Sequence, residues 1–209
     1  RGINGMNNSR ETSLFSTRNL AIISVISAIS AVLMLFDIPL WFAPSFYKLD
    51  LSEVPVLIGA FALGPLAGVV IELLKNILNF VIDGTITAGV GELANFMMGC
   101  SFVVPAAVIY SRKKTKKSAI IGLLLGTLTM ILVASLLNAY VLLPVYAKAF
   151  SWPVEKIIEM GTEINKNIDS MMDFIILVVV PFNLVKGIIA STITVAIYKK
   201  LSPIIKGVK

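Results

Sequence analysis

The chain has no histidine and only one cysteine, Cys100, among its 209 residues. A disulfide framework needs paired cysteines, so it is excluded. A zinc site usually needs several Cys or His ligands, so it is strongly disfavoured. A Cys–His nucleophile pair is disfavoured for the same reason. Cys100 lies in an apolar stretch, where a free cysteine is expected to pack as a small hydrophobic residue. We therefore expect no metal and no resident cofactor.

Charge is also scarce. Only 14% of the residues are charged, whereas a soluble domain carries about a quarter. Hydrophobic residues make up 57% of the chain and the mean hydropathy is +0.90. These values indicate a multi-pass membrane protein without a separate soluble domain. The net charge of +6 is gathered in short clusters that suit a topology signal, so nucleic acid is not an expected partner.

The apolar segments predict an all-α protein with six transmembrane helices. We expect these helices at residues 19–36, 53–63, 66–82, 92–110, 118–146 and 171–198. The second is too short to cross unless it is tilted or broken, and Gly64–Pro65 should turn the chain directly after it. The connection 37–52 is aromatic, the connection 83–91 contains several glycines, and 147–169 is polar and partly amphipathic.

Six crossings place both termini on the same side of the membrane. Arg18, the basic run 112–117 and the C-terminal lysines all fall on that side, which the positive-inside rule makes the cytoplasm. We divide the chain into residues 1–16 (an expression remnant and N-terminal tail), a single transmembrane substrate-binding domain at 17–201, and a cytoplasmic tail at 202–209.

Polar and charged side chains lie inside these apolar segments, where a charge costs about 2.5–3.5 kcal/mol on insertion scales. They are Lys75, Asn76, Asn79, Glu92, Asn95, Asn138, Asn183 and Lys186. All fall at mid-depth or in the outer half of the membrane, which predicts a cavity that opens outward and is sealed toward the cytoplasm. A pore would continue its polar lining inward. Two alternatives remain open: interhelical hydrogen bonding alone, and a simple pairing of Glu72 with Lys75.

The residue types indicate what such a cavity would hold. Primary amides both donate and accept hydrogen bonds, and carboxylates, an ammonium group and an aromatic loop accompany them. This set suits a flat, largely uncharged molecule with an amide-like edge and hydroxyl groups. It suits a bare ion or a phosphate poorly, because no arginine cluster or glycine-rich phosphate loop is present. No nucleophile or acid–base pair is evident, so the chain is not expected to be an enzyme.

Several short motifs, in order along the chain, carry a family resemblance. They are FYKLDLSEVP at 46–55, GPLAG at 64–68, KNILN at 75–79, GELANF at 91–96, LNAY at 137–140 and PFNLVKG at 181–187. The first resembles the loop signature of the substrate-binding S components of energy-coupling-factor (ECF) vitamin transporters. The others resemble the riboflavin-specific branch of that family. The resemblance covers about residues 17–200.

The resemblance implies one riboflavin in an outward-facing pocket of a multi-pass protein of the bacterial cell membrane. It also implies a transmembrane coupling (T) subunit and two cytoplasmic ATPase subunits as partners. Carried over residue by residue, the expected ligand contacts are Leu49, Asp50, Asn79, Glu92, Asn95, Asn138, Asn183 and Lys186. The family couples to its partner through small residues spaced four apart on the first helix. Ser24–Ala28 match that spacing, with Ser27–Ala31 as a second candidate, although ordinary packing explains such pairs equally well.

Other functions stay open at this point. An S component for another vitamin or a flavin analogue would have the same fold and different pocket contacts. A membrane enzyme acting on lipid headgroups would need clustered acidic ligands or a reactive side chain near the interface. A channel would need a polar lining on the cytoplasmic halves of the helices.

Overall fold

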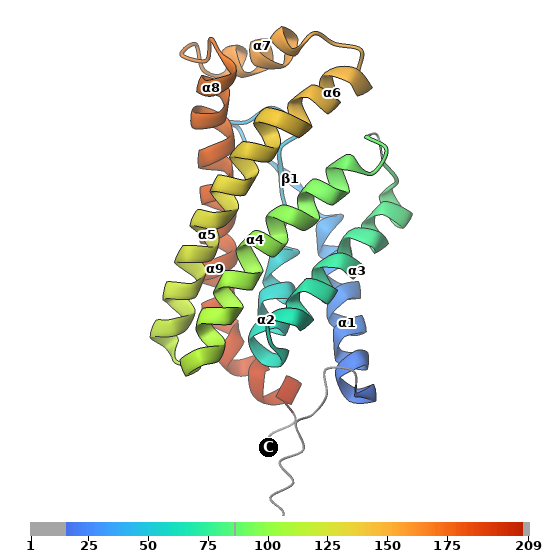
Figure 1. Ribbon diagram of the computed structural model, residues 1–209, viewed down its shortest axis with the longest axis vertical. Helices are drawn as coiled ribbons and strands as arrows, with labels where there is room; N and C mark the ends of the chain where they lie inside the picture. The colour runs from blue at the N-terminus through green and yellow to red at the C-terminus, as the bar shows by residue number, and fades with distance from the viewer. Residues whose placement is uncertain (1–15, 86, 207–209) are drawn as a thin grey trace, which may run out of the picture.

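The computed structural model describes residues 16–85 and 87–206, with side chains up to residue 200. The described chain is a helical bundle with one very short strand pair (Figure 1). Its helices are α1 (Thr17–Met34), α2 (Glu53–Leu63), α3 (Pro65–Asp83), α4 (Val90–Lys113), α5 (Lys116–Leu137), η1 (Asn138–Leu142), α6 (Leu143–Ala149), α7 (Val154–Ile164), α8 (Met171–Phe174), η2 (Ile175–Val179) and α9 (Val180–Lys206).

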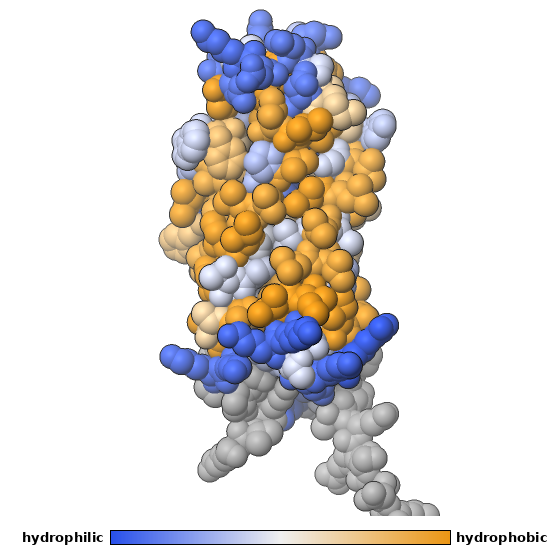
Figure 2. All heavy atoms as spheres, turned by 90° about the vertical axis from the view of Figure 1, so that its left-hand side faces the viewer, coloured by the Kyte–Doolittle hydropathy of each residue, from blue (hydrophilic) through white to orange (hydrophobic). Residues whose placement is uncertain are grey.

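Six of these units run through the bundle, as expected. Five continuous helices are long and apolar enough to cross a membrane, with α5 to α6 and α8 to α9 each forming one unit. The eleven-residue α2 is the shorter sixth. Figure 2 shows a broad apolar band between hydrophilic ends, the surface of a protein solvated by lipid. The six-helix membrane fold is thus confirmed.

Local sequence chemistry accounts for the helix ends. Ser16 caps α1 by accepting from the backbone N–H of Asn19, and Thr115 caps α5 in the same way. Between α2 and α3, Gly64 adopts a φ of 107°, a conformation that favours glycine, and Pro65 then begins α3.

The described ends of the chain lie together. In Figure 1 the start of α1, the α4–α5 turn and the end of α9 are all at the lower end, here called the basic end. The opposite end, here called the cap end, carries α6, α7 and α8. The helix α9 continues to Lys206, beyond the expected domain end at 201. The expected remnant and first tail at 1–15, and residues 207–209, lie outside the described residues.

Two features of the cap end were not expected. Residues 38–39 and 48–49 form an antiparallel pair, with Ile38 opposite Leu49, which folds the 37–52 connection back on itself. The connection 147–169 contains the helix α7, whose Ile157 and Gly161 are buried. In addition, π-helical segments interrupt the two long units at η1 and η2, and η2 ends just before Pro181. Such segments often occur at functional sites.

The core has two parts. One apolar cluster fills the basic half and includes Ile23, Leu57 and Phe102; the other fills the cap half and includes Phe174 and Val178. Met98, which lines a cavity described below, packs against both clusters. The fold therefore places the site where the two clusters meet.

Candidate functional site

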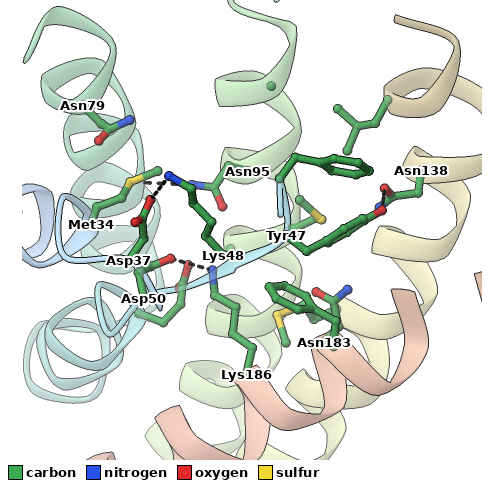
Figure 3. A pocket seen from close by; sticks show the side chains of 18 of the residues that line it. Met34, Asp37, Tyr47, Lys48, Asp50, Asn79, Asn95, Asn138, Asn183 and Lys186 are labelled. Carbon is green, nitrogen blue, oxygen red and sulfur yellow. Dashed lines mark hydrogen bonds and ion pairs between the residues drawn. The ribbon is translucent and has the colours of Figure 1, made fainter. Parts of the chain in front are cut away.

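A cavity of about 250 Å³ lies among the 37–52 connection, α3, α4, the α5–η1 unit and α9 (Figure 3). Its volume is just below the range of roughly 300–1,000 Å³ that is usual for small-molecule sites. The lining residues are Met34, Asp37, Phe46, Tyr47, Lys48, Asp50, Glu53, Asn79, Asp83, Gly91, Asn95, Met98, Gly99, Met130, Asn138, Leu142, Tyr146, Phe182, Asn183 and Lys186.

One wall of the cavity is aromatic. The ring centroid of Phe46 lies 5.0 Å from that of Tyr47 and 5.6 Å from that of Tyr146, and Tyr47 lies 5.2 Å from Phe182. These side chains come from the connection, α6 and α9, so the tertiary fold assembles the wall. Rings in such contact present faces and edges on which a flat conjugated molecule can stack.

Asparagine amides from the two π-interrupted units point into the cavity near this wall (Figure 3). The side-chain Nδ2 of Asn138 donates to the backbone oxygen of Ala134 at 2.8 Å, and that of Asn183 donates to Val179 at the same distance. The hydroxyl of Tyr47 donates to Oδ1 of Asn138. Because an N–H of each amide nitrogen donates to the helix backbone, each side-chain oxygen is the acceptor that the amide presents on its other side.

A buried ion pair closes another side of the cavity. The Nζ of Lys186 lies 3.2 Å from Oδ2 of Asp50, and the two side chains are 10% and 8% exposed. The other carboxylate oxygen of Asp50 accepts from the backbone N–H of Ser52 at 2.8 Å. The pair joins positions 136 residues apart. Each charge compensates the other, as a buried lysine or aspartate at this depth requires.

Beneath the cavity lies a fully buried cluster of one lysine and two carboxylates. The Nζ of Lys75 is 2.9 Å from Oε1 of Glu53 and 2.6 Å from Oε1 of Glu72, and all three side chains are at most 1% exposed. The alternative in which Glu72 pairs with Lys75 is thus confirmed, with Glu53 as a second partner. Glu53 also lines the cavity.

A chain of amides joins this cluster to the cavity through α4. Nδ2 of Asn95 donates to Oδ1 of Asn76 at 3.0 Å, and Nδ2 of Asn76 donates to Oε1 of Glu72 at 3.1 Å. Asn95 lines the cavity, whereas Asn76 does not. Asn95, Asn76 and Glu72 therefore connect α4 to the buried Lys75 cluster through one hydrogen-bonded network.

The mouth of the cavity carries an exposed ion pair. The Nζ of Lys48 lies 2.8 Å from Oδ2 of Asp37, and the side chains are 50% and 35% exposed. The hydrogen bond and charge of Asp37 raise the pKa of Lys48 above its usual value. Lys48 therefore stays cationic throughout the physiological range.

The structure brings most of the expected ligand residues to the cavity. Six line it: Asp50, Asn79, Asn95, Asn138, Asn183 and Lys186. Two do not. Leu49 is buried and paired with Ile38, and the carboxylate of Glu92 accepts from Thr85 Oγ1 at 3.1 Å, beside a hollow outside the cavity. Whether each lining residue binds a ligand stays a prediction.

The small residues of α1 divide between two faces. Ser24 and Ala28 are exposed, so the Ser24–Ala28 pair remains available to a neighbouring helix of a partner. Ser27 and Ala31 are each 1% exposed and pack inside this chain. The expectation that Ala31 lies at a partner interface is therefore corrected, because its surface is already covered.

Sequence reasoning missed the residues whose role comes from tertiary contacts. Glu53 and Tyr47 belong to the motif at 46–55, but the sequence does not indicate that Glu53 pairs with Lys75 or that Tyr47 binds Asn138, and it does not single out Tyr146 or Met98. The one available signal was that an acidic residue opens an otherwise apolar helix, which calls for a cationic partner. Within the described part of the chain, no group of three His, Cys, Asp or Glu side chains is placed to hold a metal ion.

Replacing Gly99 by alanine is expected to disturb the polar network. A Cβ at this position would overlap with the carboxylate of Glu72, so the carboxylate must move away from its partners. We expect Gly99→Ala to lower the melting temperature of the purified protein by several degrees. An unchanged melting temperature for Gly99→Ala would show that Glu72 can relocate without cost.

Removing the hydroxyl of Tyr47 tests the hydrogen bond that ties the aromatic wall to Asn138. Tyr47→Phe keeps the ring contacts with Phe46 and Phe182 but deletes the bond to Asn138. We expect a loss of about 0.5–1.5 kcal/mol in stability, the usual net worth of one hydrogen bond. Thermal denaturation would measure it, with Tyr140→Phe, on an exposed tyrosine, as the control. An equal effect of both changes would contradict the expectation.

Comparison with known proteins agrees with this architecture. Residues 18–198 match the family described as "ECF transporter, substrate-specific component". The riboflavin transporter RibU of Staphylococcus aureus (strain TCH60) is 36% identical over 203 residues, covering 97% of this chain and all of that protein. The riboflavin transporter FmnP of Bacillus subtilis (strain 168) is 33% identical over 89% of this chain and 93% of its own length.

A solved structure also matches. It belongs to work titled "Structure and mechanism of the S component of a bacterial ECF transporter", with a TM-score of 0.68 and 36% identity, over 90% of this chain and 96% of that one. The helical bundle, the apolar belt and the length of the sequence match lead to one conclusion: this chain is an integral membrane protein that belongs to the family of substrate-specific (S) components of ECF transporters.

Proposed function

We propose that this chain is the riboflavin-binding subunit of an ECF transporter and takes up the vitamin from the outer side of the cell membrane. The observation that carries the proposal is the composition of the cavity, with an aromatic wall beside asparagine amides and a charge-compensated lysine. The curated relatives named riboflavin transporters, which match over most of this chain, support the same ligand.

The chemistry of a flavin fits these groups. Its ring system is flat and conjugated, so it can stack against Phe46, Tyr47 and Tyr146. The pyrimidine edge has two carbonyl oxygens and one N–H, which suit the ammonium of Lys186 and the amide oxygen of Asn183. The ribityl hydroxyls suit the carboxylate of Asp50 and the amides of Asn79 and Asn95.

The assembly part of the proposal follows from the family. The sequence contains no glycine-rich phosphate-binding loop, so the energy for uptake must come from other subunits. We assign this role to a transmembrane coupling subunit and two cytoplasmic ATPase subunits, with Ser24 and Ala28 on the contacting face of α1. We assign the basic end to the cytoplasm on the basis of the positive-inside rule.

A reconstitution experiment tests the proposal. The chain would be inserted in vesicles with and without its coupling and ATPase subunits, and uptake of labelled riboflavin would be measured with ATP inside. We expect binding in both preparations and net uptake only in the complete one. A competing excess of another vitamin should leave both unchanged. Uptake of a different vitamin in place of riboflavin would assign the chain to another branch of the family.

Enlarging the small face of α1 separates binding from transport. In Ser24→Phe and Ala28→Phe, we expect riboflavin affinity to be retained, because these side chains are exposed and do not line the cavity. Uptake in the complete assembly should fall severalfold, because a bulky side chain prevents close helix approach. Ile29→Phe, at an exposed position on another side of α1, is the matched control. Loss of binding in the first two variants would show that the face is needed for folding.

A further inference from the structure

A second cavity, separate from the vitamin site, lies at the basic end. It has a volume of about 240 Å³, and its lining comes from the ends of α2, α4, α5 and α9. Phe61, Tyr110 and Tyr198 form its inner side, with the rings of Phe61 and Tyr110 stacked at 4.5 Å. Lys114, Lys116 and Lys199 form its rim. We propose that this cavity binds the phosphate-bearing headgroup of an anionic phospholipid.

The two chain segments that carry the rim lysines have charge of one sign only. Residues 108–120 and 190–206 contain no aspartate or glutamate, so no carboxylate of these segments neutralises the lysines. This differs from the cap end, where Lys48 is paired with Asp37 at 2.8 Å. Three ammonium groups from two separate parts of the chain therefore converge on one concave site. Basic pockets of this kind between transmembrane helices bind anionic headgroups.

The start of α5 adds a second attraction for an anion. Thr115 caps the helix by accepting from the N–H of Ser118 at 3.1 Å, and both Thr115 and Lys116 line the cavity. The first N–H groups of a helix have no partner within it, and the helix dipole is positive at this end. A phosphate oxygen at the rim would therefore meet backbone donors as well as ammonium groups.

The surface beside the cavity selects a lipid over a free anion. Ile120, Leu124 and Leu128 follow Lys116 at intervals of four residues, so they continue the same face of α5, and they are 41%, 61% and 60% exposed. Figure 2 shows the hydrophilic belt of the basic end directly against the apolar band. A headgroup at the rim would thus leave its acyl chain along an apolar row of the helix.

The test compares two sets of three lysines in the purified full chain. Thermal stability in neutral detergent would be measured against added phosphatidylglycerol, phosphatidylcholine or inorganic phosphate. We expect phosphatidylglycerol alone to stabilise the protein. In Lys114→Gln/Lys116→Gln/Lys199→Gln, its half-saturating concentration should rise about tenfold or more. In Lys113→Gln/Lys117→Gln/Lys200→Gln, which removes equal charge outside the cavity, it should change by less than about threefold.

The outcomes that would overturn the proposal are distinct. Equal losses in the two triple variants would show a diffuse attraction of the whole basic end rather than a site. Stabilisation by phosphatidylcholine would show that binding does not depend on the charge of the headgroup. Stabilisation by inorganic phosphate alone would show that the occupant is a free anion. Replacing the three rim lysines by arginine keeps the charge and should retain the response to phosphatidylglycerol, so a folding defect can be recognised.

Discussion

Replacing Lys75 by methionine is expected to be among the most destabilising single changes in this protein. The lysine bridges Glu53 and Glu72, and all three side chains are at most 1% exposed. Its removal would leave two carboxylates buried without a cation, and breaking a buried ion pair in this way costs about 3–5 kcal/mol. We expect little monodisperse protein after extraction and a large drop in the melting temperature of what remains.

An ion pair at the surface supplies the control. Lys48→Met breaks a contact of similar length, 2.8 Å to Asp37. The side chains of Lys48 and Asp37 are 50% and 35% exposed, so solvent screens their charges. The expected loss is at most about 1 kcal/mol. Equal effects of Lys75→Met and Lys48→Met would contradict the view that burial makes the Lys75 cluster critical.

A rescue experiment identifies the cause of the damage. In Lys75→Met/Glu53→Gln/Glu72→Gln the two carboxylates become neutral amides of similar shape, so no uncompensated charge remains. We expect this triple variant to recover most of the stability that Lys75→Met loses. If it recovers none, the lysine contributes through packing rather than charge.

Replacing Lys186 by alanine is expected to weaken riboflavin binding at least about tenfold, or about 1.4 kcal/mol. Lys186 lines the cavity and is held by Asp50 at 3.2 Å, so its ammonium is fixed at the cavity wall without a ligand. Titration of riboflavin fluorescence would measure the affinity. Lys148→Ala, which removes the same charge from an exposed position near the cap end, should leave it unchanged.

The partner of Lys186 complicates a single substitution, because alanine also leaves Asp50 unpaired. Asp50→Asn combined with Lys186→Ala removes that penalty. If the lysine contacts the ligand, the double variant should remain at least about tenfold weaker than Asp50→Asn alone, which accounts for the proposed contact of Asp50 with the ribityl hydroxyls. An affinity of the double variant equal to that of Asp50→Asn would show that the lysine serves only to neutralise Asp50.

The helices and the local polar pattern could be predicted because they depend on near neighbours in the chain. Hydropathy located the six spans, and the three-residue spacing of Glu72 and Lys75 indicated their pairing. Contacts across the fold could not be read in this way. Glu53 reaches Lys75 over 22 residues and Asp50 reaches Lys186 over 136, so the sequence showed the charges but not their partners.

The buried face of α1 could not be predicted from the sequence for a different reason. This helix is apolar nearly all round, since lipid covers one side and protein the other, so its sequence does not reveal which side is internal. The structure settles it by burying Ser27 and Ala31 while leaving Ser24 and Ala28 exposed. The strand pair at 38–39 and 48–49 could not be predicted either, because two-residue strands are too short to show an alternation of polar and apolar residues.

The absorption spectrum of the purified protein tests the central proposal most directly. The protein would be extracted from cells grown with riboflavin, and the released ligand would be identified by its mass. We expect the visible bands of a flavin and the mass of riboflavin, with both strongly reduced in Lys186→Ala. A colourless protein that also fails to quench the fluorescence of added riboflavin would contradict the assignment of the cavity to a flavin.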